Sequence, residues 1–162
     1  MMKRWTSALA GLALAAWLVP PAGAQTARGK AAAAAAAPRT VTLTANDKMQ
    51  FSAQTIEARP GEQLRVVLKN VGSMPKLAMA HNFVVLKPGT DAAAFVSAGA
   101  MERDSGYIDP EQKDKVIAAT PLSGPGESVE VTFTVPKAGK YAYVCTFPGH
   151  FAAGMSGTLV VR

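Results

Sequence analysis

The sequence contains only one cysteine, Cys145, and two histidines, His81 and His150, among its 162 residues. A single cysteine cannot form an internal disulfide, so the stability of the fold must come from packing and from any metal that binds. The sequence also has no internal repeat, no heptad pattern and no His-rich or Met-rich tract. These absences argue against disulfide-stapled, coiled-coil and repeat architectures.

Long apolar runs are also missing, because the run over residues 7–19 is shorter than the roughly 20 residues that span a membrane. This run follows Lys3 and Arg4 and precedes the small-residue pattern of residues 22–24. We therefore predict a signal peptide over residues 1–24 and a periplasmic protein that begins at Gln25. An uncleaved anchor is the weaker alternative, since the run is short and no stop-transfer pattern follows it.

Residues 25–39 are rich in alanine and contain no large apolar side chain, so we interpret them as a disordered tail or tether. The remaining residues, 40–162, suffice for one domain with a single core. Most of the formal net charge of +6 arises before residue 40, since the domain itself has 12 basic and 11 acidic residues. A nearly neutral domain predicts no nucleic-acid partner and no stable membrane insertion after signal cleavage.

Within the domain, apolar and polar residues alternate in short segments that are separated by Pro-Gly and other turn residues. Residues 91–101 break this alternation, because they are alanine-rich and start with an acidic cap, which predicts a short helix in a long crossover. The pattern predicts an all-β Greek-key sandwich or barrel of seven to eight strands with this helical insertion. The expected strand segments are residues 40–44, 63–68, 81–87, 116–119, 129–135, 141–145 and 158–162.

Three residues with metal-binding side chains, Cys145, His150 and Met155, follow one another at intervals of five after a strand-like segment. The other histidine, His81, opens a second predicted strand. A thiolate, two imidazoles and a thioether form the donor set of a trigonal copper site with a weak axial sulfur. Copper would also protect a thiol that an oxidising compartment otherwise attacks. Each residue alone says little, but together they predict one bound copper ion.

Three motifs extend this prediction, namely CTFPGH at Cys145, HNFVVL at His81 and NDKMQF near the start of the domain. They resemble the azurins, which are cupredoxins, and the resemblance covers nearly all of residues 40–162. It implies a cupredoxin-like sandwich with a type 1 (blue) copper centre that accepts and donates single electrons. It also implies His81, Cys145 and His150 as equatorial ligands and Met155 as the axial ligand.

The resemblance implies further contacts around the copper. The carbonyl of Ala80 falls where azurins have a distant second axial contact, at a glycine, and we expect at most a weak contact here. The backbone N–H groups of Asn82 and Phe147 would point at the thiolate and stabilise the reduced site. Two features depart from azurins: four residues separate His150 from Met155, as in auracyanins, and the azurin disulfide is absent.

An apolar rim is expected where the imidazole edge of His150 approaches solvent. Its candidate residues are Met74, Phe147, Pro148, Phe151, Ala152 and Ala153. An apolar, weakly charged face suits brief docking of redox proteins, such as c-type cytochromes or periplasmic oxidoreductases. For any single residue of this set, packing within the loop is an equally good interpretation.

Three other functions stay open on the sequence. Copper binding and delivery on the same fold is the strongest, although an enclosed thiolate without Met-rich or His-rich tracts does not favour it. A copper enzyme needs further histidines for a catalytic copper, which only a separate partner chain could supply. A hydrolase with Cys145 as nucleophile leaves Met155 unexplained and lacks an oxyanion-hole motif. We therefore predict a carrier and not an enzyme.

Overall fold

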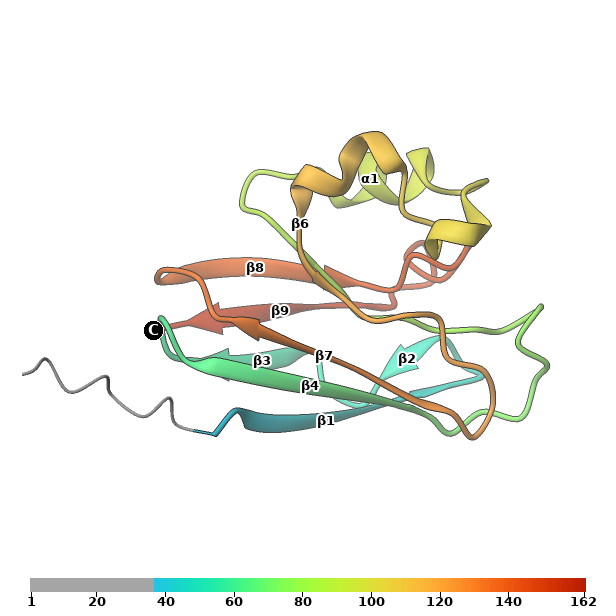
Figure 1. Cartoon of the computed structure of the whole chain (residues 1–162). Helices are drawn as coiled ribbons and strands as arrows, with labels where there is room; N and C mark the ends of the chain where they lie inside the picture. The colour runs from blue at the N-terminus through green and yellow to red at the C-terminus, as the bar shows by residue number, and fades with distance from the viewer. Residues whose placement is uncertain (1–36) are drawn as a thin grey trace, which may run out of the picture. The chain divides into compact units, whose positions relative to one another are not determined.

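The structure, a computed structural model, describes residues 37–162 (Figure 1). The predicted signal peptide and all but the last three residues of the predicted tail lie outside the described residues. The last of those three, Arg39, is already the first residue of a strand. None of the helices in residues 37–162 has the length and hydropathy needed to cross a bilayer.

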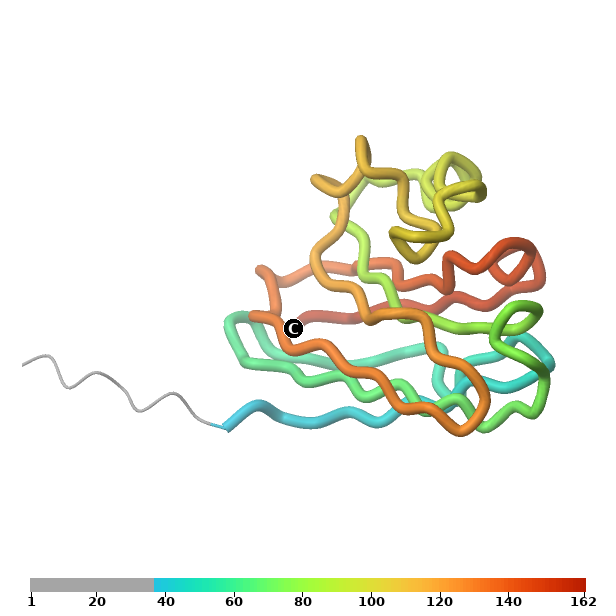
Figure 2. The backbone as a smooth tube through the Cα atoms, turned by 45° about the vertical axis from the view of Figure 1, so that its right-hand side comes forward, coloured from blue at the N-terminus to red at the C-terminus, as the bar shows by residue number. Residues whose placement is uncertain are grey.

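Two mixed sheets form the architecture (Figures 1 and 2). One sheet has the strand order β2-β1-β4-β7, with β1 (Arg39–Asn46), β2 (Gln50–Phe51), β4 (Gln63–Asn70) and β7 (Ser128–Thr134). The other has the order β3-β9-β8-β5-β6, with β3 (Thr55–Ala58), β5 (Val84–Leu86), β6 (Val116–Ala119), β8 (Gly139–Val144) and β9 (Ser156–Val161). Pairs β1–β4 and β3–β9 are parallel, and the other pairs are antiparallel.

The core between the sheets follows from the period-two pattern of the strands. In β4, Leu64, Val66 and Leu68 are buried and the residues between them are not. Side chains that alternate in this way bury one face of each sheet against the other. The all-β sandwich prediction is therefore confirmed, but residues 37–162 contain nine strands instead of seven or eight. The prediction missed β2 and β3, which have only two and four residues and leave little alternation to detect.

The predicted crossover helix is present as α1 (Ala92–Ala98), and Asp91 caps its N-terminus by accepting hydrogen bonds from two backbone N–H groups. Two 3₁₀ turns, η1 (Arg103–Ser105) and η2 (Pro110–Lys115), complete the crossover before β6. Phe95 and Val96 of α1 pack with Val84 and Val144 in a second buried cluster. The crossover thus covers the outer face of the five-stranded sheet, above β8 in Figure 1.

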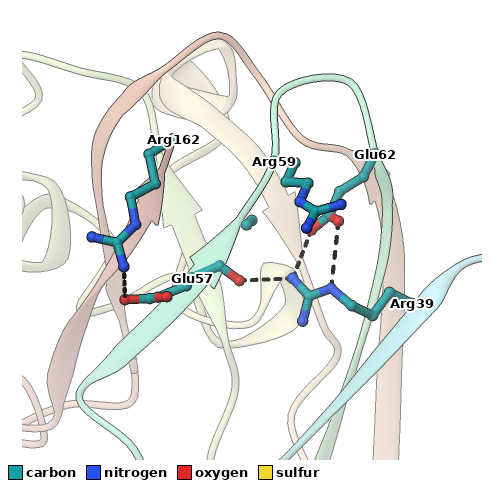
Figure 3. A pocket seen from close by; sticks show the side chains of 6 residues that line it. Arg39, Glu57, Arg59, Glu62 and Arg162 are labelled. Carbon is teal, nitrogen blue, oxygen red and sulfur yellow. Dashed lines mark hydrogen bonds and ion pairs between the residues drawn. The ribbon is translucent and has the colours of Figure 1, made fainter.

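One end of the sandwich is held by ion pairs, and we call it the charged end (Figure 3). Arg39 at the start of β1 bonds to the carboxylate of Glu62 and to the carbonyl of Glu57, which connects the two sheets. Arg162, which follows β9, pairs with the Glu57 carboxylate. These residues line an open surface cavity of about 430 Å³ together with Ala58 and Arg59.

Candidate metal centre

The sheet register brings the four predicted ligands together at the end opposite the charged end. Cys145 follows β8, and Met155 directly precedes β9, so the ligand loop 145–155 joins two neighbouring antiparallel strands. Strand β5 also pairs with β8, with Val84 opposite Val144. Because these strands are antiparallel, the residues before Val84 lie beside those after Val144, which places His81 against the ligand loop. We call this end, with residues 71–83, 120–127 and 145–155, the metal end.

Three of the predicted ligands form a tight cluster. The candidate donor atoms of His81, Cys145 and His150 all lie within 4.8 Å of one another. The sulfur of Cys145 is 3.4 Å from Nδ1 of His150, and the two imidazole centroids are 4.9 Å apart. All three side chains are buried, with exposed fractions between 0 and 2%. A buried cluster of one thiol and two imidazoles at this spacing is suited to a metal ion.

The fourth predicted ligand, Met155, is fixed next to the cluster by its backbone. Its N–H donates to the carbonyl of His150 at 3.0 Å, and its carbonyl accepts the N–H of Cys145 at 3.1 Å. The Met155 side chain is completely buried in the same core cluster as Cys145. Its thioether is therefore enclosed together with the other three donors.

The imidazole of His81 shows that the cluster is built for a ligand. Both of its ring nitrogens are buried and neither has a hydrogen-bond partner in the part of the chain that the structure describes. Buried polar atoms almost always have a partner, because an unpaired one costs roughly 1–3 kcal/mol. A metal ion bound by one nitrogen removes part of this cost, so the residues present fit a metal.

The protonation states also fit a metal that binds neutral imidazole. Burial lowers the pKa of His150 to about 4, with a further decrease from nearby His81. Burial likewise lowers the pKa of His81, opposed by the negative charge of Asp47. Both imidazoles are therefore neutral near pH 7 and can donate a lone pair.

Residues 38–162 match the family model described as "Copper binding proteins, plastocyanin/azurin family". The chain belongs to this family. Copper is therefore its metal, and the predicted azurin-like blue copper identity is confirmed.

Individual relatives of this plastocyanin/azurin protein agree with the assignment. It is 39% identical over 132 residues to azurin of Pseudomonas aeruginosa, a match that covers 78% of this chain and 87% of that azurin. It is 36% identical over 123 residues to auracyanin-B of Chloroflexus aurantiacus, a match that covers 67% of this chain and 52% of auracyanin-B. The match thus spans about half the length of that relative.

Solved structures show the same fold. The blue copper protein auracyanin A of Chloroflexus aurantiacus superposes with a TM-score of 0.69 at 32% identity, covering 77% of this chain and 99% of that one. An azurin of Methylomonas sp. strain J gives a TM-score of 0.67 at 34% identity, and the match covers 76% of this chain and 97% of that azurin. The cupredoxin fold class is therefore confirmed.

Backbone N–H groups surround the sulfur of this plastocyanin/azurin protein, as the sequence predicted. Burial raises the pKa of Cys145 to about 11, while hydrogen bonds from the N–H groups of Asn82 and Phe147 oppose this increase. These bonds favour negative charge on the sulfur. Copper must replace the thiol proton when it binds, because the metal ligand is the thiolate.

A buried network that the sequence did not predict connects the two ligand segments. The side-chain carbonyl of Asn82 accepts the N–H of Thr146 at 2.9 Å, and its amide donates to the Thr146 hydroxyl at 2.7 Å. Both Asn82 and Thr146 also donate to the carbonyl of Gly106 in the crossover. Because the partners are 24 to 64 positions apart in the sequence, no local pattern could have indicated the network.

The structure differs from the expected apolar rim at three residues, namely Phe147, His150 and Leu77. Phe147 is buried, and His150 is only 2% exposed, because the tilted rings of Phe147 and His81 pack against it with centroid distances of 4.7 and 4.9 Å. Met74 is 40% exposed, and Leu77 of the same loop, which the prediction omitted, is 71% exposed. Pro148, Phe151 and Ala152 line a surface cavity of about 420 Å³ against α1, and Ala153 is exposed.

Proposed function

We propose that this protein is a periplasmic electron carrier. One copper ion would be held by His81, Cys145, His150 and Met155. When bound, the copper supplies a reversible one-electron couple between Cu(II) and Cu(I). The observation that carries the proposal is the buried cluster of three donor residues within 4.8 Å, in which both nitrogens of His81 lack a partner.

The residues around the cluster are suited to electron transfer because they hold the ligands still. Asn82 and Thr146 connect the His81 segment to the ligand loop through several buried hydrogen bonds. Ligands that keep their positions in both oxidation states lower the cost of each transfer. A sulfur and nitrogen donor set that satisfies both states has the same effect.

Two further features of the site suit electron transfer. The side chains that would hold the copper are almost completely shielded from water, so solvent would have little access to a metal held there. The N–H groups of Asn82 and Phe147 stabilise electron density on the Cys145 sulfur. The residues therefore favour electron transfer over substrate transformation, which supports a carrier rather than an enzyme.

Redox partners would dock on the apolar side of the metal end. Met74 and Leu77 are exposed there, and Pro148, Phe151 and Ala152 line the cavity against α1. Partners of this type would be c-type cytochromes or periplasmic oxidoreductases, which need contacts that form and dissociate quickly. We place the protein in the periplasm because residues 1–24 have the pattern of a signal peptide, with 25–39 as a tail and 40–162 as the domain.

Absorption and EPR spectra of the oxidised, copper-loaded protein test the proposal, followed by voltammetry. We expect an intense visible band, a type 1 EPR signal and a reversible one-electron wave. A protein that stays colourless after oxidation, or that prefers zinc, would contradict it. The alternative of copper delivery predicts rapid loss of copper to a chelator, whereas the enclosed cluster of a carrier predicts slow loss.

A further inference from the structure

The backbone of His81 is held by a single residue, Ser123, from the loop between β6 and β7. The N–H of His81 donates to the Ser123 carbonyl at 3.0 Å. The carbonyl of His81 accepts two hydrogen bonds, from the Ser123 N–H at 2.7 Å and from the Ser123 hydroxyl at 2.9 Å. Both residues are completely buried. All main-chain bonds of this candidate ligand thus go to one partner.

The continuous ladder between β5 and β6 ends before His81, so the two backbone bonds belong to an isolated antiparallel bridge and the third comes from a side chain. The N–H of Thr120 still donates to the Phe83 carbonyl, and the Thr120 hydroxyl accepts the N–H of Phe83. The next residue is Pro121, which has no N–H to continue the ladder. Pairing resumes only at the isolated bridge between His81 and Ser123. Side-chain hydroxyls therefore supply bonds that a continuous ladder would not need.

A second side chain, Asn70, connects this bridge to the other sheet. Asn70 is the last residue of β4, and its amide donates to the Ser123 carbonyl at 3.0 Å. Its side-chain oxygen accepts the N–H of Gly72 at 2.9 Å, which fixes the orientation of the amide. The loop after β4 and the loop before β7 lie at the same end of the sandwich (Figure 1). Asn70 is buried, so its bonds do not compete with water.

We propose that Ser123 and Asn70 are positioning residues that fix the place of His81 at the metal centre. A metal-binding histidine usually has its second ring nitrogen oriented by a hydrogen bond. The imidazole of His81 has no such bond among the described residues, so the bonds to its backbone are the hydrogen bonds that fix where the ring is anchored. The proposal rests on the proposed function, in which His81 binds the copper.

The test compares Ser123→Ala, which deletes one hydroxyl donor to the His81 carbonyl, with Tyr141→Phe. The control also deletes one hydrogen bond from a hydroxyl to a backbone carbonyl, here the carbonyl of Lys137. This bond lies before and at the start of β8, toward the charged end. We expect both variants to lower the midpoint of urea unfolding to a similar extent. Only Ser123→Ala should change the copper EPR hyperfine splitting and the reduction potential.

A measurement on the metal-free protein separates this proposal from the proposed function. Hydrogen exchange of the His81 amide should become about two- to tenfold faster in Ser123→Ala and accelerate less in Tyr141→Phe, which leaves the bonds around His81 intact. Ser123→Thr, which keeps the hydroxyl, should restore slow exchange. Asn70→Leu should also make the His81 amide exchange faster, since it removes the donor to the Ser123 carbonyl.

One result would overturn the inference, and it differs from a failure of the copper assignment. If Ser123→Ala leaves the His81 exchange rate and the EPR spectrum like wild type, Ser123 contributes to packing alone. If the wild type itself lacks a type 1 signal, the proposed function fails, while the exchange rates of the metal-free variants still show whether Ser123 holds His81. Should Asn70→Leu not fold, the Ser123 variants decide the outcome by themselves.

Discussion

The two ends of the sandwich use polar groups in opposite ways. At the metal end, His81, Asn82, Ser123 and Thr146 are completely buried. At the charged end, the side chains of Arg162 and Glu57 are 72 and 61% exposed although they form an ion pair. Exposed ion pairs contribute little to stability, whereas buried polar groups cost free energy unless each is bonded. Among these four residues only His81 has buried polar atoms without a partner in residues 37–162, which indicates a site prepared for a ligand within a bonded network.

This comparison predicts that the two ends respond differently to substitution. Changes at the metal end should alter the copper centre, and those that remove an unpaired polar atom should stabilise the metal-free protein. Changes at the charged end should alter stability slightly and leave the copper centre as it is. The predictions below run from the largest expected effect to the smallest.

The largest difference should come from replacing Cys145 by serine. The variant loses the soft thiolate, so we expect the intense visible band to disappear completely from the oxidised, copper-loaded protein. Absorption spectroscopy after copper titration measures this. Arg162→Ala at the charged end is the matched control, and its spectrum should equal that of the wild type. A visible band retained in Cys145→Ser would show that this thiolate is not the copper ligand.

A second prediction concerns the cost of the unpaired His81 nitrogens. His81→Leu removes both unpaired atoms while keeping much of the volume, so the metal-free variant should be more stable than metal-free wild type, by about 1–2 kcal/mol. Urea unfolding of both metal-free proteins provides the comparison. Copper should no longer stabilise the variant, because it has lost a ligand.

The control for this prediction lies one residue away. The side chain of Asn82 is buried but completely bonded, so Asn82→Leu should destabilise the metal-free protein. Opposite signs for the two variants would confirm that the metal end contains one site prepared for a ligand within an otherwise satisfied network. A loss of stability in both would mean that His81 is stabilising without metal.

A smaller effect is expected from Met155→Leu. Its thioether is enclosed with the other donors, but an axial thioether binds copper weakly. We expect the visible band to remain and the reduction potential to rise, since the loss of this donor disfavours Cu(II) more than Cu(I). Voltammetry of the variant and the wild type measures the shift. An unchanged potential would exclude Met155 as the axial ligand.

Sequence reasoning selected the candidate donor residues that the structure brings together, but not the residues that hold them. Cys145, His150 and Met155 share one loop, and His81 stands at the start of a strand, so residue type and spacing were informative. The fold class followed from alternation in the longer strands, whereas the short β2 and β3 left no such pattern. Backbone geometry at the site had to come from the structure.

The missed residues have ordinary types and distant partners. Ser123 bonds to a residue 42 positions away, and Asn70 to one 53 positions away, so neither stands out in a local pattern. The burial of Phe147 and His150 was missed for a related reason. It depends on the contact between the rings of these two residues and on His81 from another part of the sheet.

The smallest effect should come from the ion pair of Arg39 and Glu62 at the charged end. The Arg39 guanidinium lowers the pKa of Glu62, so the pair stabilises the fold above the ordinary carboxyl pKa of 4.5 and loses this contribution as the pH falls through the lowered value. Because Arg39 is partly exposed, removing the pair by Glu62→Gln should cost less than about 1 kcal/mol at pH 7 and nothing once the carboxyl is protonated. Urea unfolding at pH 7, and at a pH at which Glu62 is protonated, measures how the cost of the substitution depends on pH. The copper EPR spectrum at pH 7 should not change. A changed spectrum would mean that the charged end is coupled to the metal end through the strands, which would remove the distinction between them.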